Sequence, residues 1–179
     1  NCTYAGKVYS TASDRIGGFA GAALSNSTMT FENCMNYGDV TGQNYSGGIG
    51  GQGSVFVSCI NHGNIQGVNY VGGISGTSSD YSNYYSSDCT NYGAVTGKTT
   101  VGGTFGKLDS AVELLRNYGN VEGVSNVGGI SGIYAQTNKS ITQCINEANI
   151  TGTNNIGGIV GYFDVSGVKY TLTLSNNNT

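Results

Sequence analysis

The chain has 179 residues, of which 31 are glycine, whereas only 9% are charged and proline and tryptophan are absent. Ordinary soluble domains contain about 7% glycine and about 25% charged residues, so this composition excludes a fold built on long helices and favours short strands joined by turns. The net charge is −3 and the seven basic residues do not cluster, which excludes the positively charged surface that nucleic acid requires.

No apolar stretch approaches the ~20 residues that a membrane-spanning helix needs, so we expect no membrane insertion. The first residues do not resemble a signal peptide, and the chain begins at Asn1 without a methionine. These features predict a processed product or a segment of a longer protein.

A glycine-rich unit recurs along the whole chain, from a partial copy at residues 1–8 to another at 174–179. A block of the form C-x-N-x-G-x-V-x-G alternates with a block that contains a Gly-Gly pair. Together the two blocks always span the same length: 34–51, 59–76, 89–106, 115–132 and 144–161. The segments between these spans vary in length. A constant part that stacks and a variable part that loops outward are typical of a repeat array.

Each unit of 25–32 residues is too short to bury its own apolar face and must stack on its neighbours. Short β-branched runs between glycines predict strands, although residues 109–117 have the composition of a short helix. We therefore predict a single all-β array over residues 1–179, a β-solenoid resembling a parallel β-helix with about six rungs.

Stacking should place similar residues in columns along the solenoid axis, ~4.8 Å apart from rung to rung. Small hydrophobic residues suit a narrow interior, and stacked asparagine amides can hydrogen-bond from rung to rung. The glycines are expected to supply positive φ angles at the turns. The two hydrophobic columns are Val40, Ile65, Val95, Val121 and Ile150, and Ile49, Ile74, Ile130 and Ile159; the asparagine column is Asn36, Asn61, Asn91, Asn117, Asn146 and Asn176.

The five cysteines fall at one position of the repeat and include no C-x-x-C pair, which argues against a zinc site. The favoured interpretation is a column of buried thiols that act as small hydrophobic residues. Disulfides between adjacent rungs are the alternative, because the rung spacing lies within the ~4.4–6.8 Å that their Cα atoms need. The column consists of Cys2, Cys34, Cys59, Cys89 and Cys144.

The recurring V-G-G-I-x-G and N-x-G-x-V-x-G blocks resemble the GLUG motif, and the resemblance covers nearly the whole chain. It implies a setting in bacterial surface proteins, including adhesins, or in the non-catalytic regions of secreted immunoglobulin-cleaving metallopeptidases. The motif marks a scaffold and does not define an activity. Leu115 in place of cysteine and Ala148 in place of glycine depart from the pattern.

Catalysis finds little support in the sequence. The one histidine, His62, occupies a position where other units carry tyrosine, which argues against a Ser/His/Asp arrangement. Glu32 and Glu113 share a repeat position but lie three rungs apart, farther than the ~5–9.5 Å between glycosidase carboxylates. Glycine-rich segments at 48–53 and near Lys98 resemble phosphate-binding loops, but the repeat explains them. We predict no enzyme activity, no cofactor and no metal.

Two kinds of surface site are predicted. An aromatic strip is a candidate edge for binding a glycan or a protein, although a self-stacking ladder that only stabilises the solenoid is the favoured interpretation. It consists of Tyr37, His62, Tyr92 and Tyr118. Six N-x-[ST] sequons permit N-glycosylation in a competent host: Asn1, Asn26, Asn44, Asn138, Asn149 and Asn177.

These features predict a non-catalytic extracellular or cell-surface module, such as a stalk, fibre or adhesin segment. Two alternatives remain open: a glycan- or protein-binding accessory region of a secreted enzyme, and a subunit of a self-assembling extracellular filament. The expected partners are neighbouring repeats, copies of the chain stacked end to end, and glycans or host surface proteins. End-to-end stacking is expected because both ends of the chain remain in phase with the repeat.

Overall fold

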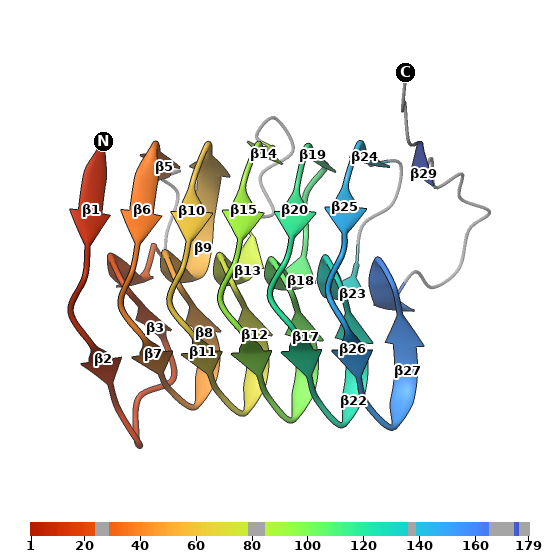
Figure 1. Ribbon diagram of the computed structural model, residues 1–179, viewed down its shortest axis with the longest axis horizontal. Helices are drawn as coiled ribbons and strands as arrows, with labels where there is room; N and C mark the ends of the chain where they lie inside the picture. The colour runs from red at the N-terminus through yellow and green to blue at the C-terminus, as the bar shows by residue number, and fades with distance from the viewer. Residues whose placement is uncertain (24–28, 79–84, 136–138, 165–173, 176–179) are drawn as a thin grey trace.

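The computed structural model describes residues 1–23, 29–78, 85–135, 139–164 and 174–175. Every paired strand runs parallel to its neighbours, and the strands stack into a β-solenoid (Figure 1). The prediction of an all-β solenoid is therefore confirmed. The described residues contain no helix, and so none that could cross a membrane.

The solenoid has four sheets that extend along its axis, each built from one or two strands of every turn. Sheet A contains β1 (Cys2–Tyr4), β6 (Cys34–Asn36), β10 (Ile60–Asn61), β15 (Thr90–Asn91), β20 (Arg116–Asn117) and β25 (Ile145–Asn146). Sheet B contains β2 (Val8–Tyr9), β7 (Val40–Thr41), β11 (Ile65–Gln66), β16 (Val95–Thr96), β21 (Val121–Glu122) and β26 (Ile150–Thr151).

Sheet C follows with β3 (Ile16–Gly17), β8 (Asn44–Gly47), β12 (Asn69–Gly72), β17 (Thr99–Gly102), β22 (Ser125–Gly128) and β27 (Asn154–Gly157). Sheet D has eleven strands, because the long β9 joins two halves. One half contains β4 (Ala20–Ala22), β9 (Gly50–Val57), β13 (Ser75–Ser78), β18 (Phe105–Leu108), β23 (Ser131–Tyr134) and β28 (Val160–Phe163). The other contains β5 (Thr30–Glu32), β14 (Ser86–Ser87), β19 (Val112–Glu113), β24 (Ile141–Thr142) and β29 (Leu174–Ser175).

The pairing register follows the sequence repeat. Cys2 pairs with Cys34, and Asn61 pairs with Asn91, so equivalent residues of successive turns are neighbours in the sheet. Because hydrophobic and asparagine positions recur at the same places in each unit, a shifted register would break every column at once. The repeat thus sets the stacking.

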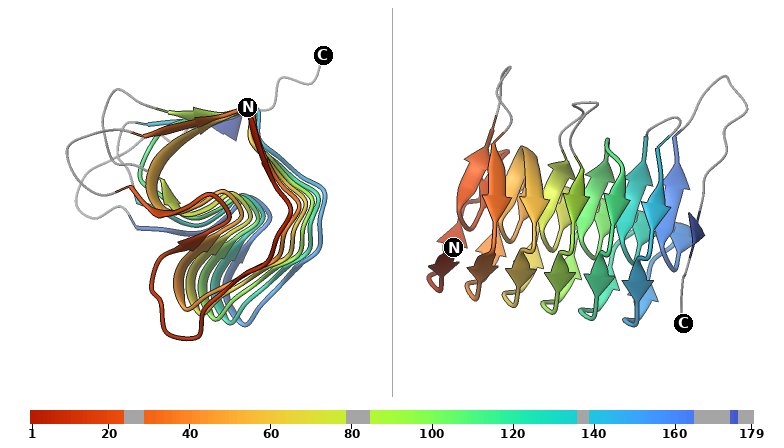
Figure 2. Two further views of the ribbon diagram at one scale, coloured as in Figure 1. Left: turned by 90° about the vertical axis from the view of Figure 1, so that its left-hand side faces the viewer. Right: turned by 90° about the horizontal axis from the view of Figure 1, so that it is seen from above.

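Viewed along the axis, the turns superimpose and their outline folds inward on one side (Figure 2). This inward fold divides the interior into two hydrophobic cores. The larger core contains Cys34, Ile49, Phe56, Cys59, Ile74, Cys89, Phe105, Leu108, Val112, Leu115, Ile130, Tyr134, Ile141 and Val160. The smaller core contains Ile16, Val40, Ile65, Val71, Val95, Val101, Val121 and Val127.

The Gly-Gly pairs between sheets C and D meet the asparagine column at a narrow waist between the two cores. A Cβ atom added to Gly73 would overlap the Asn91 side chain, and one added to Gly103 would overlap Asn117 and the Gly129 carbonyl. Only glycine lets the backbone come this close. The glycine pairs are therefore required by packing across the waist.

The asparagine column forms a continuous hydrogen-bonded ladder. Each Nδ2 donates to the Oδ1 of the next turn, at 2.7 Å from Asn36 to Asn61, 2.8 Å to Asn91, 2.8 Å to Asn117 and 2.9 Å to Asn146. Each amide also donates to the carbonyl two residues ahead, as Asn91 does to Gly93 at 2.8 Å. The predicted rung-to-rung bonding is confirmed from Asn36 to Asn146; Asn176 lies outside the described residues.

Two local predictions are wrong. Residues 109–117 do not form a helix but contain β19 and β20, because Leu115 and Asn117 fill their places in the cysteine and asparagine columns. Among the described residues Gly53 is the one glycine with positive φ, whereas ten other residues adopt it, including Tyr45 and Asn33. They recur at two bends, one before the cysteine position and one within sheet C.

Candidate functional site

The outer face of sheet A presents three rows of side chains along the axis. Residues alternate across the strand, so that Cys34 and Asn36 point inward while Met35 and Tyr37 are exposed. One row lies at the bend before the strand, one on the strand, and one just after it. This face carries the predicted aromatic strip.

The aromatic strip is an uninterrupted stack of four rings. The ring centroids of Tyr37 and His62 lie 4.7 Å apart, those of His62 and Tyr92 4.9 Å, and those of Tyr92 and Tyr118 5.2 Å. Neighbouring rings are inclined by 5°, 4° and 15°, so the faces of the inner rings are covered by their neighbours. Sugar recognition by stacking needs a free ring face. The strip therefore offers mainly ring edges to a ligand.

A groove of about 540 Å³ lies on the same face, beside the aromatic strip. Its floor includes the outward residues Met35, Ile60 and Thr90, and its wall includes residues at the bend. The complete lining is Asn1, Cys2, Thr3, Asn33, Met35, Ser58, Ile60, Asp88 and Thr90. No prediction from the sequence identified this groove, because its residues differ in type from turn to turn.

Polar contacts fix the bend side of the groove. Ser58 Oγ donates to Asp88 Oδ2 at 3.2 Å, and Arg116 Nη1 donates to Asp88 Oδ1 at 2.8 Å. Arg116 follows Thr90 in the next turn of sheet A. Its side chain reaches back to Asp88 and so marks the end of the groove in this direction.

The five cysteines occupy one register position, and all five thiols are free. Cys59 and Cys89 are fully buried, Cys34 is buried, Cys144 is half-buried and Cys2 is exposed. Burial raises the pKa of the Cys89 thiol well above its usual range and that of Cys144 to about 11. The Cys89 and Cys144 thiols are therefore protonated at neutral pH. A hydrogen bond with Cys89 instead lowers the pKa of the Cys59 thiol. Cys34, Cys59 and Cys89 pack in the larger core, and Cys144 packs against it.

The predicted sequons occupy different environments. Asn1 and Asn149 are exposed. Asn44 is half-buried, and its Nδ2 donates to Asp14 Oδ1 at 2.7 Å, so its amide nitrogen is already engaged. The remaining three lie outside the described residues: Asn26, Asn138 and Asn177.

The register separates the two glutamates that share a repeat position. Glu32 pairs with Val57, Val57 with Ser87, and Ser87 with Glu113, which is three steps of ~4.8 Å. The structure does not bring these carboxylates together. Within the described residues, no group of three or more His, Cys, Asp or Glu side chains is arranged to hold a metal ion.

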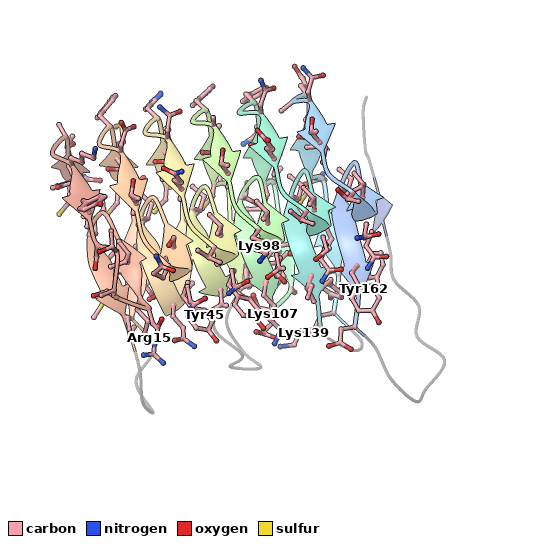
Figure 3. All side chains as sticks on the ribbon, turned by 90° about the horizontal axis from the view of Figure 1, so that it is seen from below. Arg15, Tyr45, Lys98, Lys107, Lys139 and Tyr162 are labelled. Carbon is pink, nitrogen blue, oxygen red and sulfur yellow. The ribbon has the colours of Figure 1, made fainter. Side chains whose placement is uncertain are left out.

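A second aromatic contact lies where the outline folds inward. Tyr45 and Tyr70 stack at 4.8 Å, and the Arg15 guanidinium lies 5.8 Å from the centroid of the Tyr45 ring. Arg15 Nε also donates to Gln52 Oε1, and Figure 3 shows Arg15 and Tyr45 at adjacent places on this edge. The shared position of both tyrosines before a Gly-Gly pair was the sequence signal for this stack.

No family model matches the chain, and no curated protein matches its sequence. The fold is similar to the crystal structure of a "putative immunoglobulin A1 protease" from Bacteroides ovatus, with a TM-score of 0.58 and 21% sequence identity. The similarity covers 83% of this chain and 56% of that chain. This chain therefore matches only about half of that protein, and the low identity shows the fold alone. The resemblance to GLUG repeats stays a prediction.

Proposed function

We propose that this chain is a non-catalytic, rigid module of an extracellular or cell-surface protein, in the manner of a stalk, fibre or adhesin segment. The observation that carries the proposal is the asparagine ladder, which joins five successive turns through their centre. A scaffold needs this continuity, since each turn of a solenoid contacts only its neighbours.

The ladder supports rigidity because bending the stack would stretch buried hydrogen bonds. Asn36, Asn61, Asn91 and Asn117 are fully buried, so water cannot replace a broken bond without entering the waist. A buried amide left without its partner costs about 1–3 kcal/mol. The outer ring stacks and the sheet hydrogen bonds oppose the same motion.

The segments of variable length fall at one place in each turn. They connect the two halves of sheet D, as between β13 and β14 and between β23 and β24. In the five complete units, variation in segment length is thus confined to one side of the stack. A rigid rod that presents variable segments at regular intervals fits an adhesive or spacer role.

Rigidity can be measured by the distance between two spin labels in the intact chain. Tyr9 and Thr151 are exposed and occupy one column of sheet B, five steps apart, or about 24 Å at ~4.8 Å per step. Labels attached through noncanonical residues leave the native thiols unchanged. We expect one narrow distance distribution in electron paramagnetic resonance, with the urea-unfolded chain as the broad reference. A distribution as broad as that of the unfolded chain would refute the proposal.

The second candidate is an accessory region of a secreted enzyme, and the fold similarity to the protease from Bacteroides ovatus favours it. In this role the chain would position the substrate of a catalytic domain. The test is surface plasmon resonance of the whole chain against immobilised immunoglobulin A1, with immunoglobulin G as the control. Selective binding to immunoglobulin A1 supports the accessory role, and equal or absent binding rejects this substrate.

A further inference from the structure

The groove on the outer face of sheet A is not explained by a rigid scaffold, which needs only its interior and its sheets. We propose that this groove binds a neutral oligosaccharide, extended along the solenoid axis. The proposal goes beyond the scaffold function and does not depend on it. It also moves the expected binding site from the aromatic strip to the floor beside it.

The dimensions of the groove suit a short segment of a linear glycan. Its floor crosses four successive turns through Thr3, Met35, Ile60 and Thr90, which are register partners in sheet A. Three steps of ~4.8 Å give a length of about 14 Å. Each turn thus offers one floor residue and one wall position to one unit of a repeating ligand.

The chemistry of the groove matches the two kinds of surface on a pyranose ring. A sugar has apolar C–H faces and a rim of hydroxyl groups. Met35 and Ile60 provide an apolar floor, while Asn33, Ser58 and Asp88 provide one polar side chain per turn along the wall. The Asn33 amide and the Ser58 hydroxyl can donate to and accept from sugar hydroxyls, and the Asp88 carboxylate can accept from them.

The charges in the groove favour a neutral sugar over an acidic one. Among the side chains of the lining, Asp88 is the one acidic residue, and no basic side chain lines the groove. The nearby cation, Arg116, already donates to Asp88 at 2.8 Å. At the Asp88 end of the groove, a uronate or sulfated sugar would meet this carboxylate beside a cation that is already paired with it. The Asn1 ammonium lies at the other end of the groove, where it donates to the Glu32 carbonyl at 3.3 Å.

The backbone of the groove favours a glycan over an extended peptide. Peptides often bind by adding a strand to an open sheet edge. Of the four strands beneath the groove, β6, β10 and β15 each pair with a neighbour on both sides, so their backbone groups are not available. The open edge of β1 lies on the side away from β6, at the end of the groove. A ligand on this face must be recognised through side chains.

The aromatic strip borders the groove without supplying a stacking platform. Tyr37 Oη donates to Met35 Sδ at 3.7 Å, so this side chain reaches towards the groove floor. The Tyr37 side chain is exposed. The strip can add hydroxyl contacts at the rim, but its inner rings, His62 and Tyr92, are covered on both faces.

Titration of the whole 15N-labelled chain with neutral β-1,4-linked hexasaccharides of glucose, mannose and N-acetylglucosamine tests the proposal. We expect at least one of them, at concentrations up to about 1 mM, to shift the amide signals of Met35, Ile60 and Thr90. An acidic hexasaccharide of galacturonate should bind more weakly. The proposal is overturned if no neutral sugar shifts these signals, or if the galacturonate binds more tightly.

A pair of matched variants locates the site. Ile60→Arg places a long cation on the groove floor and should weaken binding of the active hexasaccharide about tenfold. Val124→Arg makes the same change at an exposed position away from this face and should leave affinity unchanged. Far-UV circular dichroism confirms that both variants fold. Equal affinities for the two folded variants, or displacement of the sugar by an extended peptide that binds better, would reject the assignment. Because the spin-label distance does not depend on a ligand, failure here leaves the scaffold proposal intact.

Discussion

Replacing Asn91 with alanine should weaken the solenoid at its centre. Asn91 is fully buried, accepts from Asn61 at 2.8 Å, and donates to Asn117 and to the Gly93 carbonyl at 2.8 Å each. The variant loses three hydrogen bonds and leaves three buried groups without these partners. At about 1 kcal/mol per bond, plus desolvation that water cannot relieve, the expected loss is about 3–5 kcal/mol of unfolding free energy.

Urea unfolding at pH 7, followed by circular dichroism and tyrosine fluorescence, measures this loss. Two matched variants define the scale. Asn146→Ala changes a half-buried ladder residue near the end of the described stack and should cost about 1 kcal/mol, because water can replace part of its bonding. Thr96→Ala, on an exposed position of sheet B, should stay within about 0.5 kcal/mol. The reasoning is refuted if Asn91→Ala costs no more than Thr96→Ala.

Three further predictions concern other buried positions. Ser46→Val should raise the unfolding free energy by about 1 kcal/mol in the same urea assay. The Ser46 hydroxyl is buried without a partner, and its register neighbours are isoleucine and valine. A lower stability would show that the site cannot hold the extra methyl group. Gly103→Ala should prevent soluble expression or lower the melting temperature sharply, whereas Gly158→Ala, where a Cβ meets no atom within 4 Å, should be tolerated; equal behaviour of the two would contradict the packed waist. In the native chain at pH 8, a thiol reagent should label the exposed Cys2 but not Cys144, as read by mass spectrometry. Burial and a pKa of about 11 leave about one Cys144 thiol in a thousand ionised. Labelling of the two thiols at equal rates would argue against this core.

The columns could be predicted from the sequence because a solenoid converts sequence period directly into spatial contact. Once equivalent residues stack, Asn61 must lie beside Asn91 and Cys2 beside Cys34, whatever the shape of the turn. The same logic explains the ring stack, since tyrosines one turn apart are held at about the spacing of stacked rings.

The shape of each turn could not be predicted in this way. The Gly-Gly pairs were interpreted as turn residues, but Gly73 and Gly103 are needed because the chain passes close to the asparagine ladder. That contact joins two segments of the same turn. The repeat period predicts contacts between turns but not how the chain runs within one turn. The division of the interior into two cores follows from it.

Predictions from the conformational preferences of single residues were also wrong at two places. Residues 109–117 include alanine, glutamate and leucine, which favour a helix in isolation, but stacking fixes Leu115 in the larger core and Asn117 in the ladder. Positive φ falls on Tyr45 and Asn33 rather than on the recurring glycines, because the bends require it where side chains must point outward. The groove on sheet A was missed because its residues are the least repetitive on that face.

Hydrogen exchange of the asparagine side-chain amides tests the continuous ladder most directly. In two-dimensional NMR spectra, the Nδ2 protons of Asn61, Asn91 and Asn117 should exchange roughly a hundredfold or more slowly than those of the exposed Asn149, since exchange requires local opening of the buried waist. Protection should be equally strong at the three interior positions. Exchange of these protons as fast as that of Asn149 would contradict the ladder and, with it, the rigid module that it supports.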